Sequence, residues 1–168
     1  MLLTLDLATN CGFTIGDVAD RNFTFGSHRL PSTGADLGSF AWAYNDWLIP
    51  KLDGVTLCVF ESPILPQQTS MVTVRKLSGL SWHTEFRCKE RGIEVCEAQI
   101  QSVKKYFTGS GRAQKPDMIQ AAKSLGYDVK NDDESDAIAV RLYTIEQRFP
   151  ELQDRFKLAL GPLGAAAR

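Results

Sequence analysis

The chain has few of the residues on which several common kinds of site depend. Its 168 residues include only two histidines, His28 and His83, and four cysteines, which form no Cys-x-x-Cys pair. A structural zinc site and a Ser-His-Asp or Cys-His catalytic set are therefore not expected. The cysteines, at positions 11, 58, 88 and 96, are expected to be free thiols in core strands.

The sequence also lacks long apolar runs and an excess of either charge. No apolar run approaches the roughly 18–20 residues that span a bilayer, and no basic region precedes the apolar stretch of the N-terminal segment MLLTLDLATN. We therefore expect no signal peptide, no membrane association and a cytoplasmic protein. With 19 basic and 20 acidic residues the net charge is −1, so a nucleic-acid ligand has to bind a local patch.

Apolar residues make up 43% of the chain, which is enough for the core of one domain. We expect this domain to cover residues 1–160 and the low-information segment 161–168, GPLGAAAR, to be a frayed tail.

The apolar pattern predicts three strands first and an alternation of helices and strands afterwards. Strands are predicted at 2–7, 13–18, 21–27, 55–60 and 93–96, a turn at 9–12, and helices at 36–52, 70–91, 98–107, 116–125 and 133–147. Three consecutive strands favour an antiparallel meander, and later strands separated by helices join in parallel through right-handed crossovers. The fold class is α/β, a mixed five-stranded sheet with helices on both faces.

Acidic residues stand in apolar surroundings at three places. Asp6 interrupts the first strand, Glu61 directly follows the run VTLCVF, and Asp133 and Asp136 share one face of an apolar helix. Buried carboxylates are costly unless they are paired, hydrogen-bonded or bound to a metal. Converging carboxylates suit Mg²⁺ or Mn²⁺, and two such ions about 3.5–4 Å apart stabilise the attacking and leaving oxygens of phosphodiester cleavage.

Each of these acids also has a purely structural interpretation. Asp6 could be a turn residue, and Glu61 could simply end its strand. Asp132 or Asp133 could cap the following helix, whose dipole favours acids in the first turn. The functional hypothesis therefore depends on the order of all three segments in one fold.

Basic residues gather in the middle of the chain. Between positions 71 and 130 there are 11 basic and 6 acidic residues. Phosphate binding fits this excess, because lysine and arginine supply the sequence-independent part of nucleic-acid affinity. A solvated helical face is the alternative.

Four segments together resemble the RuvC-type Holliday-junction resolvases of the RNase H-like superfamily, over residues 2–143. LLTLDLATNCGFTIGD resembles the opening strand with its first catalytic acid, Asp6, and VFESP resembles the second motif with Glu61. AQIQSVKKYFTGSGRAQKPDM is similar to the basic segment with Lys115, and DESDAIAV to the closing helix with Asp133 and Asp136. The chain departs from the family at Asp6-Leu7-Ala8, where chromosomal members have Asp-Pro-Gly, and in this it looks more like phage-borne or divergent members.

The resemblance implies an RNase H-like nuclease domain that resolves four-way DNA junctions by paired nicks with Mg²⁺ or Mn²⁺, two ions per site. It implies Asp6, Glu61, Asp133 and Asp136 as catalytic metal ligands; whether Asp132 replaces Asp133 is open. In place of the family's aromatic junction wedge the chain offers Ile64 or Leu65. The expected phosphate contacts are Arg75, Lys76, Lys104, Lys105, Arg112 and Lys115.

The symmetry of a four-way junction favours a homodimer with two matched sites, and the helix at 70–91 is the candidate interface. Its side chains Leu77, Leu80, Trp82 and Phe86 cannot all face one sheet. Three other functions stay open: an RNase H-like nuclease acting on flaps, forks or RNA, a junction-binding module that does not cut, and a kinase-like ATPase domain. The ATPase needs a second phosphate loop and a longer chain.

Overall fold

The computed structural model describes residues 1–62 and 69–152. Within these ranges the elements follow in the order β1 (Leu2–Asp6), β2 (Asn10–Gly16), β3 (Thr24–Arg29), α1 (Leu37–Leu48), η1 (Ile49–Leu52), β4 (Leu57–Glu61), α2 (Met71–Glu90), β5 (Glu94–Ala98), α3 (Ile100–Thr108), α4 (Lys115–Ser124), α5 (Asp132–Arg148) and η2 (Pro150–Leu152). Residues 161–168, expected to be a tail, lie outside the described residues.

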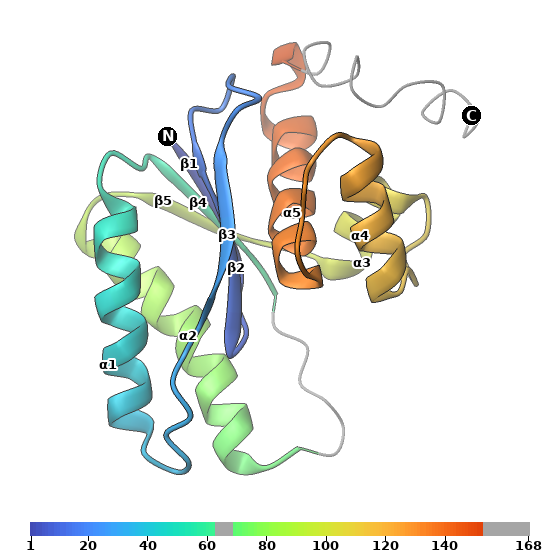
Figure 1. Ribbon diagram of the computed structural model, residues 1–168. Coiled ribbons are helices and arrows are strands. Elements are labelled where there is room, and N and C mark those ends of the chain that lie inside the picture. Colours follow the sequence, from blue (N-terminus) through green and yellow to red (C-terminus); the bar gives the residue numbers. More distant parts are fainter. Residues whose placement is uncertain (63–68, 153–168) are drawn as a thin grey trace.

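The strands form one five-stranded sheet in the order β3-β2-β1-β4-β5. β1, β2 and β3 pair antiparallel, whereas β4 pairs in parallel with both β1 and β5. The predicted fold class is confirmed, including the meander at the start and the parallel strands that follow it. The carboxyl ends of β1 and β4 therefore meet at one edge of the sheet, at the bottom of Figure 1.

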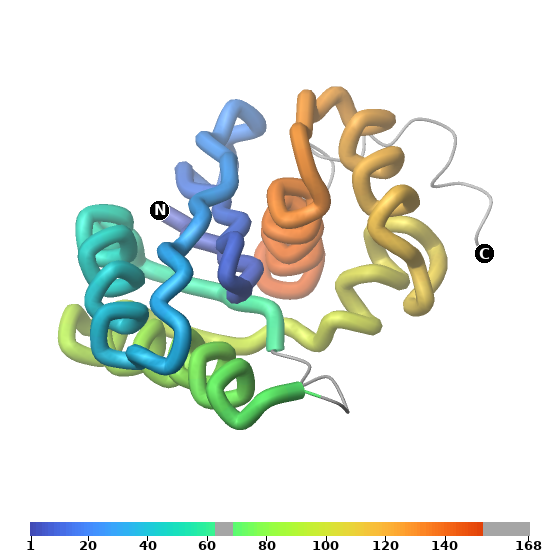
Figure 2. The backbone as a smooth tube through the Cα atoms, turned by 60° about the horizontal axis from the view of Figure 1, so that its bottom comes forward, coloured from blue at the N-terminus to red at the C-terminus, as the bar shows by residue number. Residues whose placement is uncertain are grey.

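Helices cover both faces of the sheet. α1 and α2 pack on one face over a core that includes Leu3, Leu5, Cys58 and Phe60, and α3, α4 and α5 cover the other (Figures 1 and 2). Alternation along β1 and β4 assigns Leu2, Leu57 and Val59 to the α5 face. Asp6 is four residues after Leu2, and Glu61 is two residues after Val59. Because every second residue of a strand points to the same side, both acids lie on the α5 face.

The element boundaries differ from the prediction mainly around the first hairpin. The predicted turn at 9–12 is wrong, because Asn10, Cys11 and Gly12 already belong to β2 and pair with β3. β3 lies three residues beyond its predicted start, and β5 extends to Ala98. Pairing with a neighbouring strand, which the local pattern does not encode, sets these ends.

All four cysteines are free, as predicted, and three of them are buried. Cys88, however, lies in α2 and not in a strand. In the described part of the chain, no helix is both long and apolar enough to cross a bilayer.

Candidate metal and nucleic-acid site

The four predicted acids converge where β1 and β4 end and α5 begins. Asp6 is the last residue of β1, Glu61 is the last residue of β4, and Asp133 and Asp136 lie in the first turns of α5. Their charges act on one another: Glu61, Asp136 and Asp133 all raise the pKa of Asp6. The structure thus brings together acids that are up to 130 positions apart in the sequence.

A glycine lets α5 approach the sheet closely enough for this cluster. Gly12 pairs with Asp6 across the β1–β2 ladder, and a Cβ atom at Gly12 would overlap the backbone carbonyl of Asp133. Two buried threonines hold the next turn of the helix: Thr4 donates to the carbonyl of Ala137 at 2.8 Å, and the hydroxyls of Thr4 and Thr14 lie 2.6 Å apart. The start of α5 is therefore fixed against β1 and β2.

The start of α5 is capped by Asn131, so the capping interpretation of Asp132 and Asp133 is wrong. The Asn131 side chain accepts a hydrogen bond from the Glu134 amide at 3.0 Å and donates to Ser27 of β3 at 2.9 Å. With the cap supplied by Asn131, the two aspartates lie inside the first helical turn. Their side chains are free to point to neighbours outside the helix.

Burial and mutual repulsion raise the pKa of every acid in the cluster. Glu61 is only 7% exposed, and burial, followed by the charge of Asp136, raises its pKa to about 7. Burial is also the main cause that raises the pKa of Asp136 to about 6 and that of Asp6 well above its usual range. The cluster is an anionic site that holds more charge than its own surroundings stabilise.

Asn10 is a site residue that the sequence analysis missed. Its side-chain amide donates a hydrogen bond to the carboxylate of Asp133, and this bond lowers the pKa of that acid against the effect of burial. Asn10 had been assigned to a turn, where asparagine is common. No local signal distinguishes it in the sequence, because its hydrogen bond joins segments 123 positions apart.

Two of the predicted phosphate-binding lysines border the acids. The charge of Lys104 lowers the pKa of both Glu61 and Asp136, and its ammonium donates to the carbonyl of Ala113 at 3.1 Å. Lys115, at the start of α4, makes an ion pair with Asp132. Lys104 and Lys115 therefore belong to the same site as the carboxylates.

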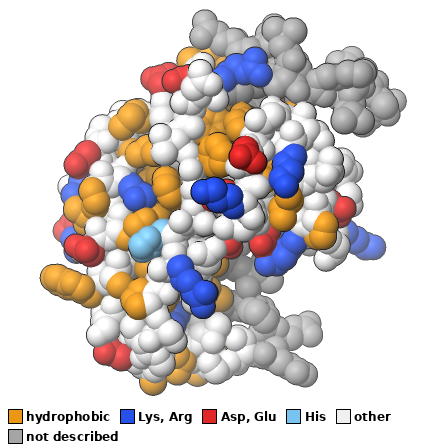
Figure 3. Space-filling model, in the orientation of Figure 1, with side chains coloured by type: hydrophobic (Ala, Val, Ile, Leu, Met, Phe, Trp, Pro, Cys, Tyr) orange, Lys and Arg blue, Asp and Glu red, His pale blue; other side chains and the backbone are white. Residues whose placement is uncertain are grey.

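The other predicted contacts lie farther out. Lys105 and Arg112 are exposed beside this border, on α3 and on the loop before α4. Arg75 and Lys76 lie on α2, on the opposite face of the sheet, and the Lys76 ammonium lies 4.7 Å from the ring centre of Phe40. On the side of the molecule turned to the viewer in Figure 3, basic side chains are scattered among acidic and apolar ones and form no continuous stripe.

The wedge candidates Ile64 and Leu65 lie outside the described residues. Their role stays a prediction.

The donor set fits a hard divalent cation. One carboxylate oxygen of Asp136 is buried and has no hydrogen-bond partner among the described residues. A buried oxygen of this kind is available to coordinate a cation. All four donors are carboxylates, the ligands that Mg²⁺ and Mn²⁺ prefer. Within residues 1–62 and 69–152, no three acidic, histidine or cysteine side chains already enclose a point where an ion would sit. Like charges move apart unless a cation neutralises them, so binding would draw these acids inward.

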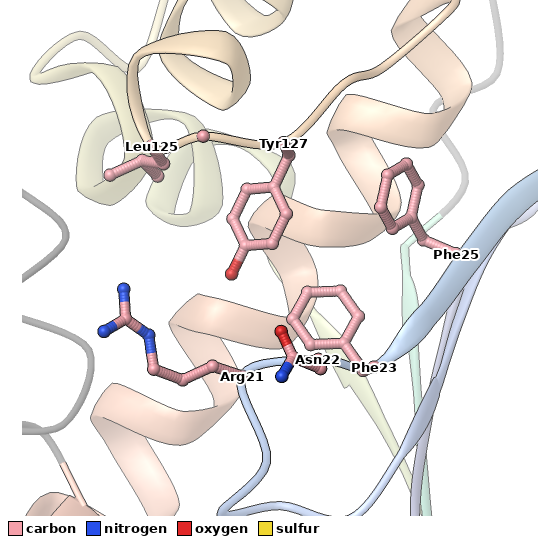
Figure 4. Close-up of a pocket in the computed structure, with 7 residues that line it drawn as sticks. Arg21, Asn22, Phe23, Phe25, Leu125 and Tyr127 are labelled. Carbon is pink, nitrogen blue, oxygen red and sulfur yellow. The ribbon is translucent and has the colours of Figure 1, made fainter.

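A hollow in the surface lies away from the acids. It has a volume of about 620 Å³ and lies between the β2–β3 connection and the loop after α4. Figure 4 shows aromatic rings on one side and Arg21 on the other; the residues that line it are Arg21, Asn22, Phe23, Phe25, Leu125, Gly126 and Tyr127. No carboxylate is among the residues that line it, so it offers none of the oxygen ligands found at the sheet edge.

The sheet order, the helices on its two faces and the acids at its carboxyl edge define an RNase H-like fold. No protein-family model matches the chain, and no curated protein sequence matches it. Solved structures, in contrast, do match the chain. The RuvC structure of Thermus thermophilus has a TM-score of 0.65 at 13% identity, with 93% of this chain and 96% of that chain covered.

Two further solved structures share the fold. T. thermophilus RuvC in complex with a Holliday-junction substrate has a TM-score of 0.66 at 14% identity, with 95% of each chain covered. The yeast mitochondrial Holliday junction resolvase Ydc2 has a TM-score of 0.65 at 11% identity, with 94% of this chain and 82% of that chain covered. The predicted resemblance to RuvC-type resolvases is confirmed at the level of the fold.

Proposed function

We propose that this protein is a divalent-metal-dependent endonuclease that resolves four-way DNA junctions by paired nicks. The observation that carries the proposal is the cluster of Asp6, Glu61, Asp133 and Asp136, with an unpartnered Asp136 oxygen, on a fold shared with solved resolvases. Structural stability does not explain four neighbouring acids with raised pKa values, because a raised pKa means that the fold disfavours the charged carboxylate relative to water.

The residues of the site have separate roles in the proposed reaction. The four carboxylates would hold Mg²⁺ or Mn²⁺, two ions per site, and Asn10 fixes Asp133 from the β2 side. Bound divalent ions stabilise both the attacking and the leaving oxygen in phosphodiester cleavage. Lys104 and Lys115 would contact the phosphates of the strand that lies over the acids, and Lys105, Arg112, Arg75 and Lys76 would contact phosphates farther along the arms.

A cleavage assay on synthetic substrates tests this proposal. The protein is incubated with a four-way junction, a fork, a flap, a linear duplex and an RNA–DNA hybrid, each with Mg²⁺, Mn²⁺ or EDTA. We expect symmetric nicks in the junction that require the metal. Asp6→Asn and Glu61→Gln should abolish the nicks, and Asp128→Asn, which replaces an exposed acid on the loop before α5, should not.

Each other result assigns a different function. Faster cleavage of forks, flaps or the hybrid favours a different RNase H-like nuclease. Tight junction binding in Ca²⁺ without cleavage in Mg²⁺ or Mn²⁺ favours a binding module. Cleavage that survives both Asp6→Asn and Glu61→Gln would overturn the assignment of the site.

We further propose that the protein acts as a homodimer through α2. Leu80 faces the core, whereas Trp82 and Phe86 are 65% and 44% exposed, with their rings stacked 5.7 Å apart. Among the described residues, no atom beyond Gly79's own stretch of helix lies within 4 Å of a Cβ atom built there, one turn before Trp82, so there is room for a partner's side chain. An exposed aromatic pair beside an open small residue is suited to self-association.

The double variant Trp82→Ala/Phe86→Ala tests the dimer. We expect it to be monomeric in light scattering, to nick single strands without pairing the nicks, and to stay folded. Trp42→Ala is the matched control, because Trp42 is 73% exposed on the other helix of the same layer. A wild-type protein that stays monomeric with junction DNA contradicts this proposal.

A further inference from the structure

One acid beside the proposed site, Asp132, has no role in the proposed function. In the first turn of α5, Glu134 accepts a hydrogen bond from the Lys130 amide at 2.8 Å, and Asp133 is bound by Asn10. Asp132 forms its ion pair with Lys115, the first residue of α4. The pair thus joins the starts of two helices that pack against each other.

Stability does not explain this pair. The Lys115 side chain is 75% exposed, so water screens most of the attraction. A lysine in the first turn is also at the positive end of the helix dipole, where a cation is disfavoured. A capping box between Gln114 and Asp117 already closes the start of α4 without Lys115.

The direction of each aspartate suggests a different explanation. Successive helical residues are rotated by about 100°, so Asp136 lies between Asp132 and Asp133 around the axis of α5. Asp133 points to β2, where Asn10 binds it, and Asp132 points to α4. Lys115 is close enough to the acids that Asp132, Asp133 and Asp136 all raise its pKa.

We propose that Asp132 is a positioning residue, which holds the ammonium of Lys115 at the rim of the carboxylate cluster so that it meets a DNA phosphate. The inference rests on the proposed nuclease function. An ammonium has three N–H donors, and the pair with Asp132 leaves the others for phosphate oxygens. Tethering the flexible lysine before DNA binds lowers the entropy that is lost on docking. Asp132 therefore acts through Lys115 and not as a metal ligand.

The test combines single and double variants with two readouts. Asp132→Asn should lower the nicking rate at saturating junction by about ten- to a hundredfold, because the phosphate contact is misplaced. Junction affinity in Ca²⁺ should change little, because the lost tether weakens binding whereas the removed negative charge strengthens it. Asp132→Glu should restore most of the rate, and Asp132→Asn/Lys115→Ala should be no slower than Lys115→Ala alone.

The contrary results are equally specific. A wild-type nicking rate in Asp132→Asn overturns the inference. So does a rate loss of the same size in the Lys115→Ala background, or a higher Mg²⁺ requirement of Asp132→Asn, because either result makes Asp132 act independently of Lys115. A similar loss in Glu94→Gln, which breaks the Arg148–Glu94 pair away from the site, would show that any lost surface ion pair has this effect.

A spectroscopic readout separates this inference from the proposed function. In ¹⁵N-labelled protein, an ammonium held in an ion pair gives a slowly exchanging signal, which is assigned to Lys115 by its loss in Lys115→Arg. We expect this signal in wild-type protein without DNA, where the pair with Asp132 is already formed, and not in Asp132→Asn. If wild type cuts no junction, the proposed function fails, and the presence or absence of this signal still supports or overturns the tether.

Discussion

Replacing Asp136 by asparagine separates the energetic cost of the carboxylate cluster from its chemistry. Burial is the main cause that raises the pKa of Asp136 from 3.8 to about 6, so the folded protein keeps this proton to higher pH than the unfolded chain does. Stability therefore falls as the pH rises from about 4 through about 6. At pH 7.5 the charged side chain costs up to about 3 kcal/mol, because one pKa unit corresponds to about 1.4 kcal/mol.

The variant Asp136→Asn should remove this cost in metal-free protein. We expect the free energy of unfolding at pH 7.5 to rise by about 1–3 kcal/mol, or several degrees in melting temperature. At pH 5 the gain should fall to about half, because wild type is then largely protonated at this position. Cleavage should be lost, and junction binding in Ca²⁺ should survive or tighten.

Thermal melts in EDTA at the two pH values, with nicking measured on the same preparations, check this prediction. Asp128→Asn is the control and should change neither quantity, because its side chain is exposed outside the cluster. A variant that melts below wild type at both pH values would refute the reasoning, because Asp136 would then be a stabilising acid of the first turns of α5. Nicking at the wild-type rate would refute its role as a ligand.

Three further predictions test the same site. Mg²⁺ or Mn²⁺ should raise the melting temperature of wild type more at pH 7.5 than at pH 5, because the cation binds ionised carboxylates; an equal rise in Asp136→Asn contradicts this. Gly12→Ala should destabilise the fold by roughly 3 kcal/mol or more in urea unfolding, since the new methyl group overlaps the Asp133 carbonyl; an unchanged midpoint would disprove that close approach. Lys115→Ala should weaken binding to all DNA sequences alike and reduce the salt slope by about one contact; an effect on stability alone would remove Lys115 from the interface.

The succession of strands and helices along the chain, and the division of the sheet into an antiparallel and a parallel part, could be predicted because local patterns indicate them. Buried runs such as VTLCVF are typical of strands covered on both faces, and the helices between later strands require parallel crossovers. The ends of the elements could not be predicted in the same way. β2 begins at Asn10 because Asn10 and Cys11 pair with Arg29 and His28 of β3, a contact between separate segments.

The acids of the site could be singled out because they interrupt apolar segments, which is a local signal. Their partners could not, since Asn10 and Asp133 are 123 positions apart and Lys115 meets Asp132 only after α4 packs on α5. Gly12 illustrates the same limit: its place in the predicted turn at 9–12 accounts for a glycine, whereas in the structure it admits the backbone of α5.

The repulsion within the cluster also explains why several buried hydrogen bonds hold α5 against the sheet. Four neighbouring acids repel one another, and without a cation this repulsion favours moving α5 away from β1 and β4. The buried contacts Thr4–Thr14 and Thr4–Ala137, together with the Asn131 cap, oppose that movement at the end of the helix where the acids lie. Near the middle of α5 the fully buried Arg141 donates to the carbonyls of Leu2 and Asp17. A helix held at its start and near its middle cannot move far from β1 and β4, so the folding energy of the domain offsets part of the repulsion among the acids before any ion binds.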